Sequence, residues 1–387
     1  MKWGEYRMDR PARIGISGSY GGMNLGDEGI LHSMLRQLRE SLPVELTVFS
    51  RNPGDTRERH GVDRAIPIRE LTKEEARAEV ARLDLFILGG GGILYDRDAA
   101  IYLREVALAR EAGVPVVVYA IGAGPLNDAA VRKEVARQLN GVAAISVRDR
   151  QARKLLEDIG VEREIKVTAD PALLLETEPL PPDALKAEGL DSNTRVVGFS
   201  VREPGPAAPD IDVDHYHALL ANAADFMVDR FDADIAFVAL ERAKMDMQHC
   251  HAVAARMRCA PRALVIKGEY TSGQLLTLVK RFQFSVGMRL HFLIFSALQG
   301  VPFVALPYAS KVRGFIESID MPMPPLKEVT TGRLIAHIDR SWDTQQTLRD
   351  RIARNLPKLQ ELARLNNRIA LSVLSERMSA AAAGGES

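Results

Sequence analysis

The chain has 387 residues, of which 46% are hydrophobic and 26% are charged, as in an ordinary globular protein. Its 51 Lys and Arg residues balance its 51 Asp and Glu residues, so no net charge draws it to nucleic acid or to an anionic membrane. The two cysteines, Cys250 and Cys259, form no CxxC pair, which argues against a disulfide framework or a cysteine-based zinc site.

Short apolar runs alternate with amphipathic stretches in the first half of the chain, a pattern typical of a parallel α/β sheet. Asp27, Asp128 and Asp149 are candidate N-caps of three of the helices. The predicted strands are 13–18, 45–50, 84–88, 114–120, 143–147 and 165–168, and the predicted helices are 27–41, 73–83, 99–112, 128–139 and 149–159.

A proline-rich stretch at 176–193 separates this series from a second one. The second series has predicted strands at 195–201, 235–239, 264–266, 282–286 and 303–306, and a last amphipathic segment at 344–378 that Pro357 interrupts. We therefore predict an α/β protein with two Rossmann-like domains that face a central cleft. The predicted ranges are 1–178 for the first domain, 179–193 for a linker, 194–343 for the second domain, and 344–387 for C-terminal helices and a tail.

Glycine-rich segments follow three strands of the first series, at 18–28, 89–92 and 121–125. The first contains neither a GxGxxG fingerprint nor the Lys of a P-loop. Its Asp27 is either a helix cap or, with Glu28, part of a ligand cleft. Four consecutive glycines at 89–92 predict a loop whose backbone something large approaches. Three glycine-rich loops at successive strand ends predict a deep cleft with few charged groups. Such a cleft suits a sugar better than a polyphosphate.

Cationic residues follow other strands. Arg289 and His291 come at the start of a predicted helix, where positive charge is unfavourable unless an anion compensates it. Lys311 follows the next strand, so these three residues predict an anion site. Arg148 either reaches the cleft or is an ordinary surface residue. Asp170 is either a cleft carboxylate or an Asx turn.

Six motifs in order carry a resemblance to a known family: GSYGGMNLGDEGI, LGGGGILYD, YAIGAGP, SVRDRQARKLL, VTADPALLL and GMRLHFLIFSALQGVPFVALPYASKVRGF. Between about Arg13 and Ile319 the chain resembles the polysaccharide pyruvyl transferases. The resemblance implies a GT-B-like fold. It also implies transfer of the pyruvyl group of phosphoenolpyruvate to two hydroxyls of an envelope or exopolysaccharide sugar, which forms a cyclic ketal and releases phosphate.

The resemblance also assigns roles to the two domains and to single residues. The first domain would be the acceptor side and the second domain the phosphoenolpyruvate side. His291 would be the general acid, because histidine exchanges protons near neutral pH. Arg148 and Lys311 would hold the phosphate and the carboxylate, with Arg289 assisting, and either Asp27 or Asp170 would accept the hydroxyl proton. The predicted catalytic residues are His291, Asp27 and Asp170, and the predicted substrate-binding residues are Arg148, Lys311, Arg289, Asn24, Gly90, Gly91 and Gly92.

No cofactor or metal is implied by this chemistry, and the i,i+2 spacing of His215 with His217 and of His249 with His251 argues against a metal site. The implied partners are phosphoenolpyruvate and a lipid-linked, nucleotide-linked or polymeric sugar acceptor; peripheral membrane contact and a homo-oligomer stay open. The N-terminus is charged and lacks the apolar core of a signal peptide, which predicts a cytoplasmic protein. A place at the inner face of the membrane stays open.

Two other functions stay open from the sequence. One is a nucleotide-sugar glycosyltransferase of GT-B fold, whose glutamate for the donor ribose is replaced here by Ser296. The other is a non-catalytic relative that binds glycan.

Overall fold

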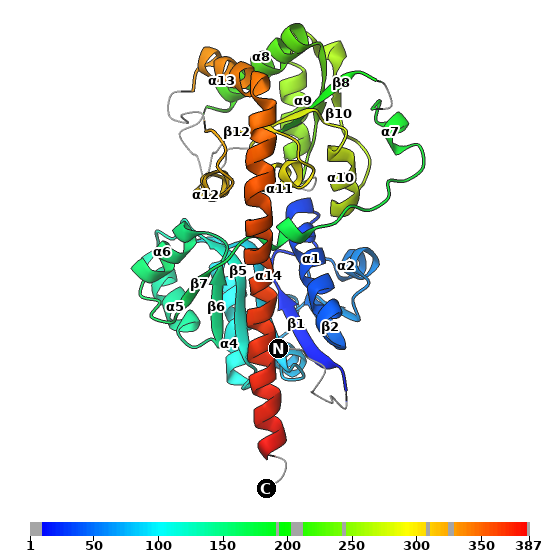
Figure 1. Ribbon diagram of the computed structural model, residues 1–387. Helices are drawn as coiled ribbons and strands as arrows, with labels where there is room; N and C mark the ends of the chain where they lie inside the picture. Colours follow the sequence, from blue (N-terminus) through cyan, green and yellow to red (C-terminus); the bar gives the residue numbers. More distant parts are fainter. Residues whose placement is uncertain are drawn as a thin grey trace. The chain divides into compact units, whose positions relative to one another are not determined.

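The computed structural model describes residues 10–190, 193–202, 212–241, 245–306, 310–323 and 329–384. The chain divides into two compact units. The first consists of residues 1–22, 27–174 and 359–387, and the second of residues 23–26 and 175–358. Each unit is a parallel β-sheet flanked by helices (Figure 1). This arrangement confirms the predicted α/β class and the two Rossmann-like folds.

The first unit contains a seven-stranded sheet in the order β3-β2-β1-β4-β5-β6-β7. The strand order reverses between β1 and β4, the point at which ligands bind in such sheets, beyond the carboxyl ends of the strands. The strands are β1 (Ala12–Ser17), β2 (Val44–Phe49), β3 (Arg64–Ile66), β4 (Leu85–Leu94), β5 (Val116–Ala123), β6 (Ala144–Val147) and β7 (Ile165–Val167); the helices are α1 (Leu25–Ser41), α2 (Pro53–His60), α3 (Lys73–Val80), α4 (Ala99–Glu111), α5 (Ala129–Leu139) and α6 (Arg150–Asp158).

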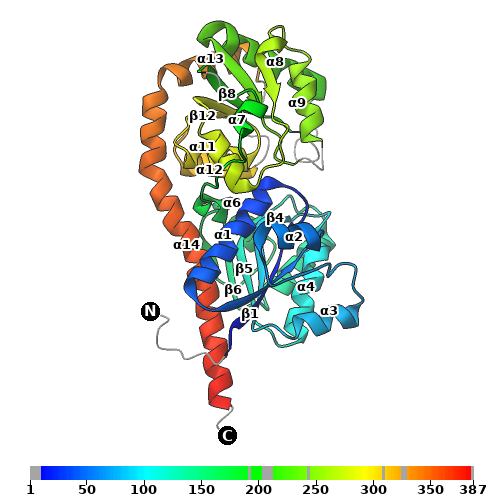
Figure 2. The ribbon, with the colours of Figure 1, turned by 90° about the vertical axis from the view of Figure 1, so that its right-hand side faces the viewer.

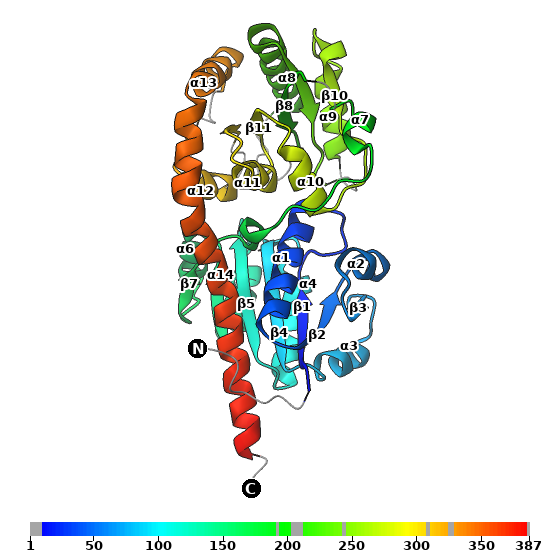
Figure 3. The ribbon, with the colours of Figure 1, turned by 45° about the vertical axis from the view of Figure 1, so that its right-hand side comes forward.

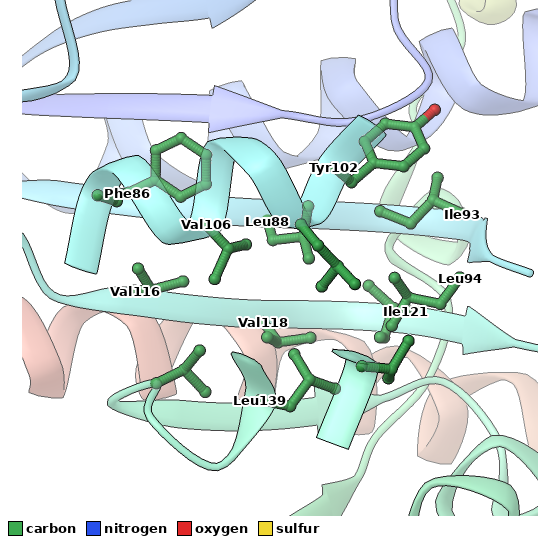
Figure 4. Close-up of a cluster of buried hydrophobic side chains, with 14 of the residues drawn as sticks. Phe86, Leu88, Ile93, Leu94, Tyr102, Val106, Val116, Val118, Ile121 and Leu139 are labelled. Carbon is green, nitrogen blue, oxygen red and sulfur yellow. The ribbon is translucent and has the colours of Figure 1, made fainter. Parts of the chain in front are cut away.

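Helices cover both faces of this sheet. Figure 2 shows α1 on one side with the end of the last helix, α14 (Gln345–Gly384), and α3 and α4 on the other. On the latter side a continuous apolar core forms between β4, β5 and the helices, with Phe86, Leu88, Val106 and Val118 among its buried residues (Figure 4). Strands buried on both faces read as near-continuous apolar runs, which is why the sequence indicated them.

The second unit repeats the plan with five strands in the order β10-β9-β8-β11-β12, and its switch point lies between β8 and β11. Helices α8 and α9 lie together on one side of this sheet, and α10 and α11 lie on the other (Figure 3). The elements are α7 (Ala184–Ala187), β8 (Arg195–Ser200), α8 (Val213–Phe231), β9 (Ala233–Phe237), α9 (Asp246–Ala254), β10 (Ala263–Val265), α10 (Ser272–Val279), β11 (Phe284–Gly287), α11 (Leu290–Leu298), β12 (Phe303–Ala305), α12 (Ser310–Ser318) and α13 (Thr331–Asp343).

The glycine run is the clearest difference from the sequence prediction. Gly89–Gly92 does not form a loop but continues β4, where Gly89 pairs with Tyr119 and Gly91 with Ile121 of β5. What approaches this backbone is the protein's own helix α1, because a Cβ at Gly90 would lie 2.2 Å from Ile30 Cγ2. The segment expected as a third loop, 121–125, likewise begins inside β5.

Two further expectations about elements are wrong. Helix α1 begins at Leu25, so Asp27 lies in its first turn and is not its N-cap. Helix α14 continues through Pro357 without interruption. Strand β3, at 64–66, and helix α2, at 53–60, were not foreseen. The strand has only three residues, and the helix is short and mostly polar, so neither gives a clear hydrophobic period. Among the described residues, no helix is both long enough and apolar enough to cross a bilayer.

Candidate functional site

Arg148 follows β6 at the carboxyl edge of the first sheet. Its backbone N–H donates to Ile121 O at 3.1 Å, and its guanidinium donates to Asp170 Oδ2 at 2.9 Å. The two side chains are only 4% and 5% exposed. Gly122 of β5 leaves room for this guanidinium, since a Cβ there would lie 2.7 Å from Arg148 Nη2. Arg148 is therefore a buried, oriented cation rather than an ordinary surface residue.

Asp170 fixes that orientation. Its Oδ2 accepts from Arg148, and its Oδ1 accepts from the backbone N–H of Ala172 at 3.0 Å, so the Asx turn and the position at the sheet edge occur together. Asp149, beside Arg148, caps α6 by accepting from Ala152 N–H at 2.7 Å, as predicted. We assign Asp170 a positioning contact with Arg148, and its role as proton acceptor stays a prediction.

The two carboxylates at the start of α1 have different surroundings. Asp27 is half-buried, and its Oδ1 would lie 3.1 Å from a Cβ at Gly91. Glu28 is fully buried; it accepts from Gly21 N–H at 2.9 Å and bonds His60 Nε2 at 2.8 Å. Glu28 thus holds the glycine-rich segment through a buried hydrogen bond. This corrects the expectation that Glu28 lies in a ligand cleft. Gly92, by contrast, is exposed.

Residues 23–26 belong to the second unit although the chain on both sides of them belongs to the first. Leu25 anchors this turn: its N–H donates to Leu240 O at 2.9 Å, and its carbonyl accepts from Ser272 Oγ at 2.7 Å. Asn24 forms an antiparallel bridge with Glu241, and its Oδ1 accepts from Gly26 N–H at 3.0 Å. The glycine-rich motif therefore supplies part of the second unit.

Arg289 precedes α11 directly, at the switch point of the second sheet. It is 9% exposed, and its guanidinium donates to Glu241 Oε2 at 2.8 Å and to Asp246 Oδ2 at 2.9 Å. The sequence predicted that an anion must compensate this cation. The anions are two carboxylates of the chain itself, so the structure gives Arg289 a scaffold role where the sequence predicted a ligand contact.

His291 lies in the first turn of α11 and is half-buried. Its ring packs directly on the Asn24–Gly26 turn, because a Cβ at Gly26 would lie 1.9 Å from His291 Nδ1. Lys311 is the second residue of α12 and is also half-buried. The part of its predicted loop at 307–309 lies outside the described residues.

The structure thus gathers the predicted residues into two groups. Arg148 and Asp170 form one, in the first unit, and Asn24, Arg289 and His291 form the other, in the second unit. The convergence of Arg148 with His291 and Lys311 stays a prediction.

Sequence reasoning missed Glu241 and Asp246. The rule that functional side chains follow strands would have found Glu241, which comes four residues after the end of β9. Asp246 carried no such signal, because its contact with Arg289 depends on how α9 and α11 pack.

Two of the histidines that the sequence considered as metal ligands contact each other. His217 of α8 and His249 of α9 are buried, and His217 Nε2 lies 2.8 Å from His249 Nδ1. Burial, and then the neighbouring His249, lower the pKa of His217. Within the described ranges, no group of three or more His, Cys, Asp or Glu side chains is arranged to hold a metal ion.

Solved structures place this fold among known proteins. The chain resembles the UDP-GlcNAc 2-epimerase from Neisseria meningitidis bound to UDP-GlcNAc, with a TM-score of 0.64, 10% identity, and coverage of 93% of this chain and 100% of that one. It also resembles a glycosyltransferase from Rickettsia africae, with a TM-score of 0.63, 11% identity, and coverage of 96% and 99%. The fold class is therefore GT-B-like, as predicted.

A family model shows the particular family. The polysaccharide pyruvyl transferase model matches residues 24–310, and the chain belongs to this family. It is a transferase, and the family implies a pyruvyl donor and a sugar acceptor. A comparison of the sequence with curated proteins gives no match.

Proposed function

We propose that this transferase moves the pyruvyl group of phosphoenolpyruvate onto two hydroxyls of an envelope or exopolysaccharide sugar, forming a cyclic ketal and releasing phosphate. The proposal rests on family membership together with one observation. That observation is the position of His291 at the switch point of the second sheet, beside an Arg289 that Glu241 and Asp246 hold in place.

The reaction needs an acid in this position. His291 donates a proton to the methylene carbon of phosphoenolpyruvate, and the neighbouring carbon becomes electron-poor. A sugar hydroxyl attacks that carbon, forming the first C–O bond. Phosphate then leaves as the second hydroxyl attacks the same carbon and closes the ketal. Of the two hydroxyl protons, one restores His291 by way of a base and the other leaves on phosphate, so the protons balance.

Cations hold the donor in this proposal. Lys311 binds the phosphate as a compact charge, and Arg148 binds the carboxylate through its planar guanidinium. Asp170 already accepts one N–H of Arg148, which leaves other N–H groups to meet a ligand. Asp27, half-buried near Gly91, is our preferred base for the sugar hydroxyl.

A buried serine argues against a nucleotide-sugar donor. Ser296 stands where the ribose-binding glutamate of such transferases is expected, yet it is fully buried. Its hydroxyl lies 2.9 Å from both Phe292 O and Ser285 Oγ. Ser296 is therefore part of the packed core of the second unit, where it does not face a donor ribose. This supports pyruvyl transfer over glycosyl transfer.

The test is phosphate release from phosphoenolpyruvate with sugar diol acceptors, followed by mass spectrometry of the product. We expect His291→Gln to lower kcat by about 10²–10⁴-fold while phosphoenolpyruvate still binds. The matched control is His251→Gln, which replaces an exposed histidine of the same unit and should leave kcat unchanged.

Two outcomes would contradict the proposal. Wild-type turnover in His291→Gln would remove His291 as the acid. Absence of pyruvylated glycan, with envelope glycans identical in cells with and without the protein, would remove the reaction itself.

A further inference from the structure

A buried amide of α14, the helix that runs along the first sheet (Figure 1), contacts the ends of β6 and β7. Asn366 is 0% exposed. Its Oδ1 accepts from Ser146 Oγ and from Thr168 Oγ1, both at 2.7 Å. Its Nδ2 donates to Ala169 O at 3.1 Å and to Ala363 O at 3.0 Å. Every hydrogen-bonding position of the amide is therefore used, and the two carbonyls fix which end of the amide donates.

This asparagine lies on an apolar stripe of the helix. Ala363, Ala370 and Leu374, which share its face, are fully buried as well. An apolar side chain in its place would pack without needing partners, whereas a buried amide is costly unless all its polar groups are paired. A fully paired polar group of this kind selects one arrangement of its partners. Asn366 therefore specifies where the two strand ends lie, beyond helping to cover the sheet.

The strand ends that Asn366 contacts carry the ion pair of the first unit. Ser146 comes two residues before Arg148, and Thr168 comes two residues before Asp170. Arg148 Nη1 and Asp170 Oδ2 are 2.9 Å apart. Because a single residue separates each contact from its charged residue, a shift of β6 against β7 would move the guanidinium relative to the carboxylate.

Ser146 extends the same contact to β5. Its Oγ accepts from the N–H of Ala120 at 2.9 Å. Ala120 has a φ of +50°, which residues with a Cβ rarely adopt, and the pairing of β5 with β6 is irregular there. The next residue, Ile121, accepts at its carbonyl from the N–H of Arg148 at 3.1 Å. The hydroxyl that Asn366 orients thus also fixes the part of β5 that holds the backbone of Arg148.

We propose that Asn366 is a positioning residue for the donor: it holds the ends of β5, β6 and β7 so that Arg148 meets the carboxylate of phosphoenolpyruvate in one orientation. This inference rests on the proposed function, in which Arg148 binds that carboxylate. Asn366 does not touch the donor and acts through Ser146, Thr168 and the ion pair of Arg148 with Asp170.

The first test is a double-mutant cycle between Asn366 and Arg148, with the Kd of phosphoenolpyruvate measured by calorimetry on the full chain. Asn366→Ala should weaken binding by about tenfold, and Arg148→Gln by about 10–100-fold. In the Arg148→Gln background, Asn366→Ala should add less than about twofold, because changes that act through one shared group are not additive. Equal losses in both backgrounds would indicate a general effect on the fold and would overturn the inference.

Asn367 supplies the matched control. It is buried at the next position of α14, but its Nδ2 donates to Gln37 O at 3.3 Å and to Ser41 Oγ at 2.9 Å, both in α1. Asn367→Ala also loses a buried amide and should keep the wild-type Kd. If Asn366→Ala folds poorly, Thr168→Val removes one hydroxyl and should weaken binding by about 2–10-fold, whereas Thr168→Ser keeps the hydroxyl and should bind normally. Wild-type binding in Thr168→Val would overturn the inference.

A second measurement does not depend on the donor. The Nε of Arg148 is buried, so its N–H signal in an NMR spectrum reports the position of the side chain in the free protein. Asn366→Ala should shift this signal, and Asn367→Ala should not. A shifted signal, with wild-type donor binding in Arg148→Gln, would support the positioning contact and overturn the donor role proposed for Arg148. An unshifted signal, with donor binding lost in Arg148→Gln, would overturn this inference and leave the transfer proposal standing.

Discussion

The ring of His291 depends on Gly26 having no side chain. A Cβ at Gly26 would lie 1.9 Å from Nδ1, 2.4 Å from Cγ and 2.8 Å from Cβ of His291. Because even the His291 Cβ is too close, rotation of the ring does not relieve the overlap. The glycine-rich motif of the first strand and the histidine of α11 are therefore parts of one packing arrangement, although they lie far apart in the sequence.

Gly26→Ala should displace His291. A shift of about 1 Å in a catalytic group can cost about 10²-fold in rate, and we expect a fall of that order in kcat. Overpacking should also lower the free energy of unfolding by about 1–3 kcal/mol. Gly332→Ala is the control, because it lies in α13 with nothing within 4 Å of its Cβ. Wild-type kcat in Gly26→Ala would show that the position of His291 does not matter.

Glu105 of α4 makes stability depend on pH. It is 1% exposed and accepts from Ser17 Oγ and from Arg69 Nε. Burial raises the pKa of its carboxyl, against the lowering effects of Arg69 and Ser17. A raised pKa means that the folded chain holds this proton more tightly than the unfolded chain. The stabilising effect of this bound proton is therefore complete below the unfolded-state pKa of about 4.3. It is lost as the pH rises through the pKa of Glu105 in the folded chain.

Glu105→Gln removes this titration. We expect the wild-type free energy of unfolding to fall relative to the variant between pH 4 and pH 7. The fall should be about 1.4 kcal/mol for each unit by which folding raises the pKa. Urea unfolding of both proteins at three pH values checks this, and a difference that is constant or grows with pH would contradict it.

Among the secondary-structure elements, the glycine run and α14 were both misread from the sequence. Gly89–Gly92 stays in β4 because β5 pairs with its backbone while α1 packs close above it. Pro357 does not break α14, although proline removes one helical hydrogen bond. Ala353, whose carbonyl loses that bond, is exposed, and so is Pro357, so solvent can reach the unpaired group.

Pro357→Ala should restore the missing bond. Proline costs about 3 kcal/mol against alanine inside a helix, and its restriction of the unfolded chain returns about 0.4–1 kcal/mol. We therefore expect a gain of about 1–3 kcal/mol, seen as a higher urea midpoint. The neighbouring exposed Lys358→Ala should change stability by less than about 0.5 kcal/mol. No gain in Pro357→Ala would contradict this prediction.

At the scale of the whole molecule, the last helix belongs to both units. Residues up to 358 group with the second unit, and those from 359 group with the first. In the first unit, Asn366 is fully buried; its Oδ1 accepts from Ser146 Oγ and Thr168 Oγ1, both at 2.7 Å. Ala363, Ala370 and Leu374 are fully buried beside it. The C-terminal segment is thus a structural part of the first unit.

Deletion of residues 359–387 should therefore unfold the first unit. Each fully buried apolar side chain contributes about 1.5–3 kcal/mol, and several such losses approach the total stability of about 5–15 kcal/mol. Hydrogen exchange should become fast in β6 and β7 but not in β8 and β11. Addition of a peptide spanning 359–384 should restore slow exchange. Slow exchange in β6 and β7 without the peptide would contradict this prediction.

The sequence by itself determined the two α/β series, most strand positions, the caps at Asp128 and Asp149, and the motifs of the family. These depend on local periodicity, turn chemistry and residue order, which a single segment carries. Only the tertiary structure decided that Glu241 and Asp246 compensate Arg289, that Gly26 receives His291 and that α14 completes the first unit. Those contacts join segments far apart in the chain, and their partners are selected by packing and by the need to pair buried charge, which no local pattern records.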